Sequence, residues 1–379
     1  MKHSYPSIDW QEKSQSHRGL WYSEAQLPAP QEVMLIDDTI KANKAIELAR
    51  QGIGLLWVGD YQNGRELLRS ITRRLDRPPR VGSQKIPTLP AEIFALHRQN
   101  QGQKAQILGQ ILITLTPDFV INLRRGQDVS QACKDVIGEI TQPIVMPFKQ
   151  LLAIVSAHEW RKKKVFVPSL KEHIIPHFGV YSPLRGEYLE LAMQAPLPKN
   201  HVQAFDIGAG TGVLSILLAK RGFEKVTASD MDSRAIACAQ ENIQALGLGE
   251  KITVVQADLF PQGRADLVVC NPPWLPAQPS SPIEHAIFDP GSRFLQEFIT
   301  QLPEHLAIDG QAWLIISDLA EHLGLRTRQE LLNMISKAGL VVLEQLQTKP
   351  KHPKVQDEND PLHFARVKEV SSLWVLGLQ

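Results

Sequence analysis

The segment 204–212, with the sequence AFDIGAGTG, is the most informative part of this chain for its fold. A short apolar strand runs directly into glycines at every second position, Gly208, Gly210 and Gly212, and an apolar helix is expected over 213–219. Glycine lets a backbone approach a ligand closely, and the free N–H groups at a helix N-terminus can then face that ligand. The segment therefore predicts the strand–loop–helix unit of an α/β fold, with a ligand at the loop.

Aspartates accompany this loop. Asp206 precedes the glycines by two positions, and a second strand, expected over 226–229, ends at Asp230 about twenty residues later. A carboxylate at the end of that strand can accept hydrogen bonds from both hydroxyls of a ribose. Asp232 could take this part instead, although its position suits the N-cap of the following helix better. The pattern predicts that a nucleoside binds at this edge.

A third strand is expected over 252–256, and Asp258 follows it. A carboxylate there can accept from the amino group of an adenine, and Leu259 or Phe260 can flank the ring. Ligands of open α/β sheets bind at the carboxyl ends of the strands. The order of the motifs along the chain therefore favours one site that is built from three successive strand ends.

A fourth apolar strand, 268–270, ends at Asn271, Pro272, Pro273 and Trp274. The two prolines have stiff φ angles and no N–H, so they hold backbone carbonyls outward beside the side-chain carbonyl of Asn271. Trp274 adds a flat apolar face. Such a corner suits a planar group that bears an NH2, because two N–H bonds are accepted while the plane stacks. The alternative is a proline-rich loop after an ordinary strand.

With these motifs, residues 166–379 resemble the class I S-adenosylmethionine (SAM) dependent methyltransferases of the "small domain" group. This group includes the HemK-like release-factor glutamine methyltransferases and several RNA guanine or adenine N-methyltransferases. The resemblance implies a Rossmann-like α/β fold with a seven-stranded, mostly parallel sheet and a reversed final strand. It implies SAM as the cofactor, with Met231 and Asn271 beside it. It also implies that Tyr181 and Arg185 lie in a segment that covers the methionine end of SAM.

The resemblance implies N-methylation, with a catalytic set of Asn271, Pro272, Pro273 and Trp274. The nitrogen of an exocyclic amine or an amide is a poor nucleophile, because its lone pair is conjugated. If Asn271 and the Pro272 carbonyl accept its two N–H bonds, the lone pair is directed out of the plane toward the sulfonium methyl. Trp274 would stack on the target. Because SAM is already reactive, the protein mainly positions the groups.

Three interpretations remain open. A dinucleotide-dependent oxidoreductase would need a G-x-G-x-x-G loop and would leave residues 271–274 unexplained. A SAM-binding module without catalysis would not need the complete set of polar groups. An N-methyltransferase that acts on a macromolecule accounts for every motif, but nucleobases and glutamine share the planar NH2 group. The basic N-terminal half favours RNA, whereas the sequence Phe288–Asp289–Pro290 favours the glutamine enzymes.

The length of 379 residues exceeds one methyltransferase domain, so two domains are expected, over 1–165 and 166–379. Residues 1–170 contain 23 Lys and Arg against 16 Asp and Glu, a net +7, whereas residues 171–379 contain 18 against 24, a net −6. No apolar run approaches the roughly 18–20 residues that span a bilayer. We therefore expect a protein without a membrane segment.

No metal is expected. His173 and His177 are four residues apart, but Pro176 argues against a continuous helix between them and no third ligand completes a set. Cys133, Cys238 and Cys270 are too few and too scattered for a disulfide framework or a zinc site. Cys270 is expected in the core of its strand. This cysteine usage suits a reducing cytoplasm.

The N-terminal half is expected to be a smaller, mixed α/β, helix-rich and basic domain that recognises the substrate. Helices are predicted over 39–50 and 64–75, and strand-like or mixed structure over 107–115 and 119–123. On the second helix the leucines and Ile71 make the buried stripe, so Arg69, Arg73 and Arg74 are available for phosphates. The alternative is a solvated helix face.

Overall fold

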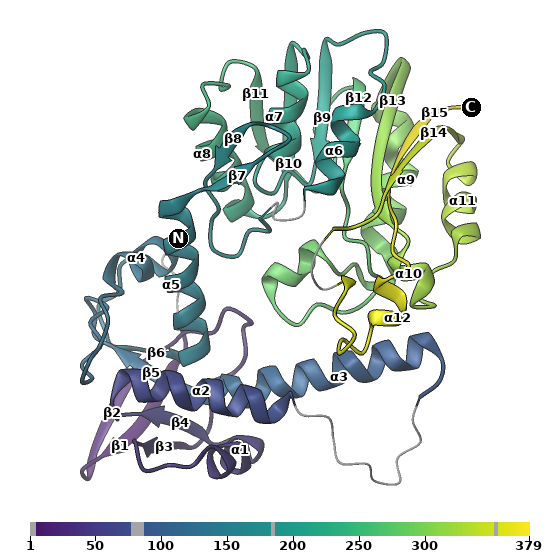
Figure 1. Ribbon diagram of the computed structural model, residues 1–379. Coiled ribbons are helices and arrows are strands. Elements are labelled where there is room, and N and C mark those ends of the chain that lie inside the picture. Colours follow the sequence, from purple (N-terminus) through teal and green to yellow (C-terminus); the bar gives the residue numbers. More distant parts are fainter. Residues whose placement is uncertain (1–4, 77–86, 183–185, 352–354) are drawn as a thin grey trace. The chain divides into compact units, whose positions relative to one another are not determined.

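The computed structural model describes residues 5–76, 87–182, 186–351 and 355–379. The chain forms two compact units, one of residues 1–86 and 96–159 and the other of residues 87–95 and 160–379 (Figure 1). Helices α3 (Pro90–Gly109) and α5 (Phe148–Lys163) each contribute residues to both units. Among the described helices, none is long and apolar enough to cross a membrane.

The C-terminal unit is built on a seven-stranded sheet in the order β11-β10-β9-β12-β13-β15-β14. Every strand runs in the same direction except β15, which is antiparallel to both of its neighbours. This arrangement confirms the predicted α/β fold with a mostly parallel sheet and a reversed final strand. The strands are β9 Gln203–Ile207, β10 Lys225–Asp230, β11 Ile252–Gln256, β12 Ala265–Cys270, β13 Leu306–Ser317, β14 Leu340–Thr348 and β15 Ser371–Leu378.

The apolar strands of this sheet are buried on both faces, as parallel sheets require. Along β12, Leu267 and Val269 join the core cluster with α6, α7 and α8, whereas Val268 and Cys270 join the cluster with α9 and α11. The two sets of helices therefore cover opposite faces of the sheet (Figure 1). The helices are α6 Glu187–Gln194, α7 Val213–Lys220, α8 Ser233–Ala245, α9 Arg293–His305 and α11 Arg328–Lys337.

Most predicted elements of this unit are confirmed. The strands expected over 226–229, 252–256 and 268–270 lie in β10, β11 and β12, and the helix expected over 213–219 is α7. Strands β14 and β15 form an antiparallel pair. The polar stretch between those two strands contains a short helix. The remaining small elements are β7 Val165–Val167, β8 Glu172–Ile174, α10 Leu319–His322, α12 His363–Arg366 and two 3-10 turns, Pro282–Ala286 and Pro290–Ser292.

The N-terminal unit has a six-stranded mixed sheet in the order β1-β2-β6-β5-β4-β3. Strands β3, β4 and β5 are parallel to one another, and β6 is antiparallel to β5. The strands and helices that belong wholly to this unit are β1 Ser7–Glu12, β2 Gln15–Trp21, β3 Val33–Ile36, α1 Ala42–Arg50, β4 Gly54–Trp57, α2 Tyr61–Leu75, β5 Ile111–Leu115, α4 Ser130–Ile137 and β6 Ile144–Pro147.

The two predicted helices of this unit are confirmed as α1 and α2. The segment 107–115 divides between the end of α3 and β5. The strand-like or mixed structure expected over 119–123 is not found, because the chain makes a loop there, in which Phe119 is buried with a positive φ of 58°. Burial of one aromatic ring in a turn mimics the apolar pattern of a strand.

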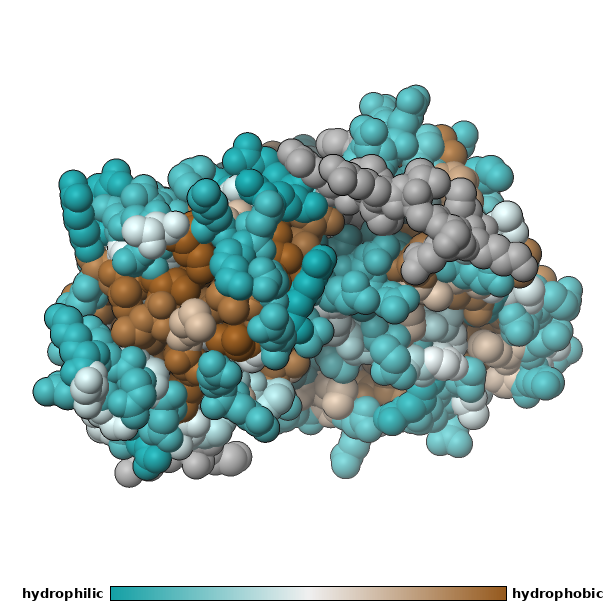
Figure 2. Space-filling model, turned by 90° about the horizontal axis from the view of Figure 1, so that it is seen from below, coloured by the Kyte–Doolittle hydropathy of each residue, from teal (hydrophilic) through white to brown (hydrophobic). Residues whose placement is uncertain are grey.

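One face of the N-terminal sheet carries an apolar cluster that includes Trp10, Trp21 and Leu112 and to which no described helix contributes. Val33 and Leu35 of the edge strand β3 pack against this cluster and stay partly exposed. Figure 2 shows apolar side chains gathered on this unit and ringed by polar ones. Helix α1 packs against α2 and β4.

Candidate active site at the carboxyl edge of the C-terminal sheet

The loop between β9 and α7 leaves space beside its backbone. Gly208, Gly210 and Gly212 have φ angles of 78°, 54° and 80°, which side chains rarely adopt. A Cβ atom at Gly208 or Gly210 would meet nothing within 4 Å, whereas one at Gly212 would lie 3.3 Å from the Cα of Ala239 in α8. The first two glycines thus border open space, and the third lets two helices pack closely.

Asp206 is fully buried at the end of β9. Its Oδ2 accepts from the backbone N–H (2.9 Å) and the Oγ (2.5 Å) of Ser215 in α7. Oδ1 has no hydrogen-bond partner among the described residues. Burial raises the pKa of Asp206 to about 6, and the bonds from Ser215 offset part of this effect. Sequence reasoning missed Ser215, because nothing in a helix serine signals a distant acceptor.

Tyr188 of α6 was also missed. Its ring is buried, and burial is the main cause that raises the pKa of its phenol, with the charges of Tyr181 and Asp206 adding to the effect. Tyr188 belongs to the same core cluster as Ala209 of the glycine loop. Tyr181 itself is 37% exposed, and Arg185 lies outside the described residues.

Asp230 ends β10 and faces the same loop. Its Oδ2 accepts from the N–H of Gly210 (3.0 Å), and its Oδ1 accepts from the N–H of Asp232 (2.9 Å). Burial is the main cause that raises the pKa of Asp230. A carboxylate offers about four lone-pair positions, so two remain for ligand hydroxyls. Asp232 caps α8 by accepting from the N–H of Arg234, as predicted, and Met231 is 65% exposed between the two aspartates.

The turn after β11 is held in a strained conformation. Asp258 is exposed, and Leu259 has a left-handed φ of 71° while its carbonyl accepts from the Oγ of Ser229 (2.5 Å). Such conformations persist only where the surroundings impose them. The ring of Phe260 stacks on His305, with centroids 4.3 Å apart, and therefore faces α9. Whether Leu259 or Phe260 flanks an adenine stays a prediction.

The corner after β12 is ordered by its own side chains. The indole Nε1–H of Trp274 donates to Oδ1 of Asn271 (3.0 Å), which leaves the second lone pair of that oxygen available. Trp274 also packs against the core clusters of both sheet faces. Cys270, just before the corner, is fully buried with a raised pKa, which burial causes, so it belongs to the strand core.

Arg326 contributes to this corner although the sequence did not single it out. Its side chain is 6% exposed, and its Nη2 lies 3.5 Å from the carbonyl oxygen of Trp274. Burial is the main cause that lowers the pKa of this guanidinium. Asp289, which favoured the glutamine enzymes in the sequence, accepts from the N–H groups of Phe294 (2.9 Å) and Leu295 (3.1 Å) at the start of α9.

The segment before α6 is tied to α8. Asn242 accepts from the N–H of Ile175 (2.7 Å) and donates to the carbonyl of Thr211 in the glycine loop (3.1 Å). Nε2 of His177 contacts Glu241, which also pairs with Arg161 at 2.8 Å. Over the described part of the chain, no three His, Cys, Asp or Glu side chains are placed to hold a metal ion.

These groups fit SAM. The open space at Gly208 and Gly210 admits a ligand against the backbone, and Asp230 retains acceptor capacity for ribose hydroxyls. The unpaired Oδ1 of Asp206 lies in the strand that enters the loop and can accept from a cationic ligand. Asp258 adds an exposed acceptor at the next strand end.

The three arginines predicted to bind phosphate lie on α2 in the N-terminal unit. Arg69 pairs with Glu66, and Arg74 donates to the Oδ1 of Asn43 (2.9 Å) and to the carbonyl of Ser70 (3.1 Å). Arg69 and Arg73 line a hollow of this unit, and Arg74 is not among its lining residues.

Known proteins resemble the C-terminal unit. A family described as "methyltransferase small domain" matches residues 173–342. A putative protein N5-glutamine methyltransferase of Methanocaldococcus jannaschii is 31% identical over 151 residues, which cover 38% of this chain and 75% of that protein. A tRNA1(Val) adenine-37 N6-methyltransferase of Shewanella halifaxensis is 32% identical over 145 residues, or 35% of this chain and 57% of that protein.

Other relatives match over shorter stretches. A ribosomal protein L11 methyltransferase of Desulfitobacterium hafniense is 45% identical over 75 residues, which cover 19% of this chain and 24% of that protein. Among solved structures, ribosomal protein L11 methylase from Lactobacillus delbrueckii has a TM-score of 0.39 at 17% identity, over 55% of this chain and 86% of that one.

Proposed function

We propose that this chain methylates the exocyclic amine of a base in RNA. The chain belongs to the methyltransferase small-domain family, whose members are SAM-dependent methyltransferases. The chain is a SAM-dependent N-methyltransferase, and its relatives act on macromolecules. What we propose is the choice of RNA as the macromolecule and of a base amine as the target nitrogen.

The corner of Asn271 and Trp274 carries the proposal. When bound, SAM supplies a methyl group on a cationic sulfonium. Asn271 Oδ1 has one lone pair occupied by the indole N–H of Trp274, and this bond orients the amide. Its other lone pair and the carbonyl of Pro272 would accept the two N–H bonds of the target. The target nitrogen would then bond to the methyl carbon as the bond from the sulfonium sulfur to that carbon breaks. S-adenosylhomocysteine would be the leaving group, and the nitrogen would release one proton to water.

Two observations support RNA as the substrate. The N-terminal half carries a net charge of +7 from 23 basic and 16 acidic residues, which suits a polyanionic substrate. Two relatives are named as tRNA adenine N6-methyltransferases. An adenine presents the planar NH2 group that the corner would accept.

A protein glutamine is the second candidate. The relative that is 31% identical over 75% of its own length is named as a protein N5-glutamine methyltransferase. A glutamine amide has the same planar NH2 geometry, so the corner alone does not choose between the two substrates.

The test is a methyl-transfer assay on separated cellular fractions. Methyl-labelled SAM would be incubated with the full-length protein and either total RNA or total protein from cells that lack its gene. We expect label in nucleosides released by nuclease, at the base amine. If label appeared only in N5-methylglutamine after protein hydrolysis, the substrate would be a protein glutamine and not RNA. An absence of label in both fractions, with a control methyltransferase active, would contradict N-methylation of a macromolecule.

A further inference from the structure

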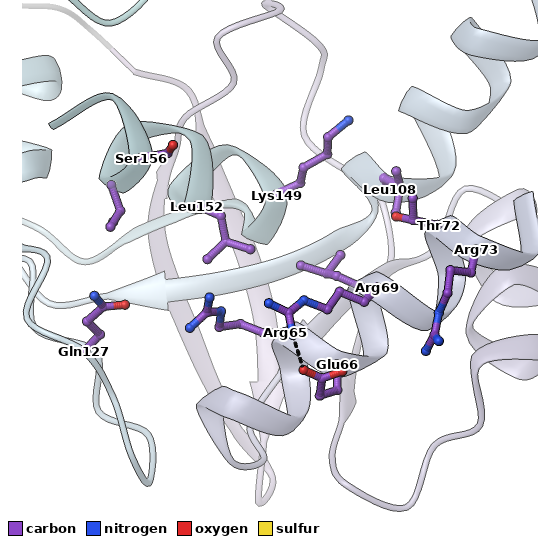
Figure 3. A pocket seen from close by; sticks show the side chains of 12 residues that line it. Arg65, Glu66, Arg69, Thr72, Arg73, Leu108, Gln127, Lys149, Leu152 and Ser156 are labelled. Atoms are coloured by element: carbon purple, nitrogen blue, oxygen red, sulfur yellow. Dashed lines mark hydrogen bonds and ion pairs between the residues drawn. The ribbon is translucent and has the colours of Figure 1, made fainter. Parts of the chain in front are cut away.

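The N-terminal unit contains a hollow between α2 and α5 that none of the motifs of the catalytic unit explains. Its volume is about 840 Å³, and Figure 3 shows side chains of both helices lining it. The lining side chains are Arg65, Glu66, Leu68, Arg69, Thr72, Arg73, Leu108, Gln127, Lys149, Leu152, Val155 and Ser156. All of them belong to one compact unit.

The hollow is basic. Four cations, Arg65, Arg69, Arg73 and Lys149, stand against one carboxylate, Glu66, so the lining carries 4 − 1 = +3. Arg69 pairs with Glu66, but both side chains are about 60% exposed, and exposed pairs contribute little. Arg73 has no hydrogen bond or ion pair with any residue that the structure describes. The guanidinium of Arg73 is therefore available for an anion, whereas Arg65 donates one hydrogen bond to Oε1 of Gln62 (3.1 Å).

Beneath the cations the hollow is apolar. Leu68 and Leu108 are 5% and 1% exposed, and Leu152 and Val155 of α5 lie opposite them. The hydroxyls of Thr72 and Ser156 add neutral hydrogen-bonding groups. Lys149, at the start of α5, is exposed and adds a further cation to the lining.

This combination suits a ribonucleotide strand. Guanidinium groups bind phosphate oxygens through two parallel N–H bonds. Apolar side chains contact the face of a base or a sugar, and hydroxyl groups can bond a 2′-OH, which distinguishes RNA. An acidic peptide would use the cations but would leave the apolar floor without a matching group.

We propose that the hollow between α2 and α5 binds the sugar–phosphate backbone of the RNA substrate. This inference rests on the proposed function and names how that substrate is held. It also revises the set predicted from the sequence. Arg69 and Arg73 line the hollow, Arg65 and Lys149 join them, and Arg74 instead bonds Asn43 and Ser70.

Two adjacent arginines of α2 allow a matched test. Arg73→Glu places a carboxylate in the hollow, whereas Arg74→Glu makes the same change of charge one residue away and outside it. Binding of a fluorescein-labelled RNA stem–loop to the full-length protein would be followed by anisotropy, without SAM, over a range of salt concentrations. We expect Arg73→Glu to weaken binding roughly tenfold at low salt and to lower the log–log salt slope by roughly 0.7–0.9. Arg74→Glu should have a much smaller effect.

Several outcomes would overturn the inference. Equal weakening by both variants would mean that only general charge attracts RNA. Equally tight binding of polyglutamate, with the same loss in Arg73→Glu, would assign the hollow to acidic protein surfaces. Because binding is measured without SAM, failure of RNA methylation alone would contradict the proposed function and leave the hollow intact. Circular dichroism and SAM calorimetry on each variant would show that the protein is folded.

Discussion

Each unit of this protein contains a parallel strand that runs into a glycine-containing turn and then a helix, yet only one turn leaves room for a ligand. In the C-terminal unit, a Cβ atom at Gly208 or Gly210 would meet nothing within 4 Å. In the N-terminal unit, a Cβ atom at Gly59 of the turn would lie 2.9 Å from the backbone N of Asp38, and one at Gly64, in the first turn of α2, would lie 2.6 Å from Cε1 of Phe148. The second turn is packed against the protein itself.

The acidic residues beside the two turns, Asp60 and Asp230, also differ in whether the protein itself already pairs them. Asp60 caps α2 by accepting from the N–H of Gln62 (2.9 Å) and accepts from Nε of Arg125 (2.7 Å). The bond from Arg125 is the main cause that lowers the pKa of Asp60. Asp230 has no cation paired with it in the described structure. Its carboxylate accepts hydrogen bonds from the backbone N–H groups of Gly210 and Asp232. A ligand site therefore needs both unfilled space and an acceptor that the fold has not already paired.

The largest effect that the comparison predicts is on catalysis. Asn271→Ala removes the side-chain acceptor at the corner without touching the glycine loop. Turnover on the true substrate should fall on the order of 10²–10³-fold, by analogy with the loss of one preorganised polar group. Single-turnover methyl transfer would measure the loss, and calorimetry should show SAM affinity almost unchanged. Full activity in the variant would make the corner a structural loop.

The next effect concerns the stability of the open turn. Because the pKa of buried Asp206 is raised to about 6, its ionisation opposes folding: its contribution is favourable below about pH 4 and is lost as the pH rises through about 6. The raised pKa corresponds to about 3 kcal/mol in the free energy of unfolding. Asp206→Asn keeps the acceptor for Ser215 and should remove this dependence. Urea unfolding of both proteins between pH 4 and 7 should give a difference that grows with pH, and parallel curves would contradict the assignment.

A Gly→Ala change should affect the two strand–turn–helix units differently, lowering stability in one and SAM affinity in the other. Gly64→Ala would bring Cβ within 2.6 Å of the buried ring of Phe148 and 2.8 Å of Trp57. Overpacking of this kind costs about 1–3 kcal/mol, which exceeds the gain of up to about 1 kcal/mol in helix propensity. Thermal unfolding should show the loss, with SAM affinity unchanged. Gly210→Ala should weaken SAM binding, because its methyl group would enter the open space of the loop, and its left-handed φ of 54° would add some backbone strain. A loss of SAM affinity in Gly64→Ala would break the distinction.

The smallest effect concerns the two acids. Asp230→Ala should weaken SAM binding by about 1–3 kcal/mol, because ligand hydroxyls would lose their acceptor. Its counterpart, Asp60→Ala, should lower the free energy of unfolding through loss of a helix cap and leave SAM affinity unchanged. Titration calorimetry and urea unfolding on both variants would check this. A folded Asp230→Ala protein that binds SAM as tightly as the wild type would exclude Asp230 as the ribose acceptor.

Local patterns in the sequence determined the architecture of the C-terminal unit. Glycines at positions 208, 210 and 212 permit the left-handed backbone that the loop adopts, and apolar runs that end at Asp230 and Asn271 place those side chains at one sheet edge. Each of these signals involves residues within a few positions of one another. The periodicity and spacing of residues in the sequence are therefore enough to predict these features.

Only the tertiary structure decided which groups meet across the chain. The partner of Asp206 is Ser215 on the next helix, Phe260 turns to His305, and Arg326 approaches Trp274 from 52 residues away. In the N-terminal unit, Arg65 and Lys149 join one hollow although 84 positions separate them, while Arg74 bonds Asn43 outside it. Side-chain direction and packing between distant segments set these contacts, and neither leaves a periodic trace in the sequence.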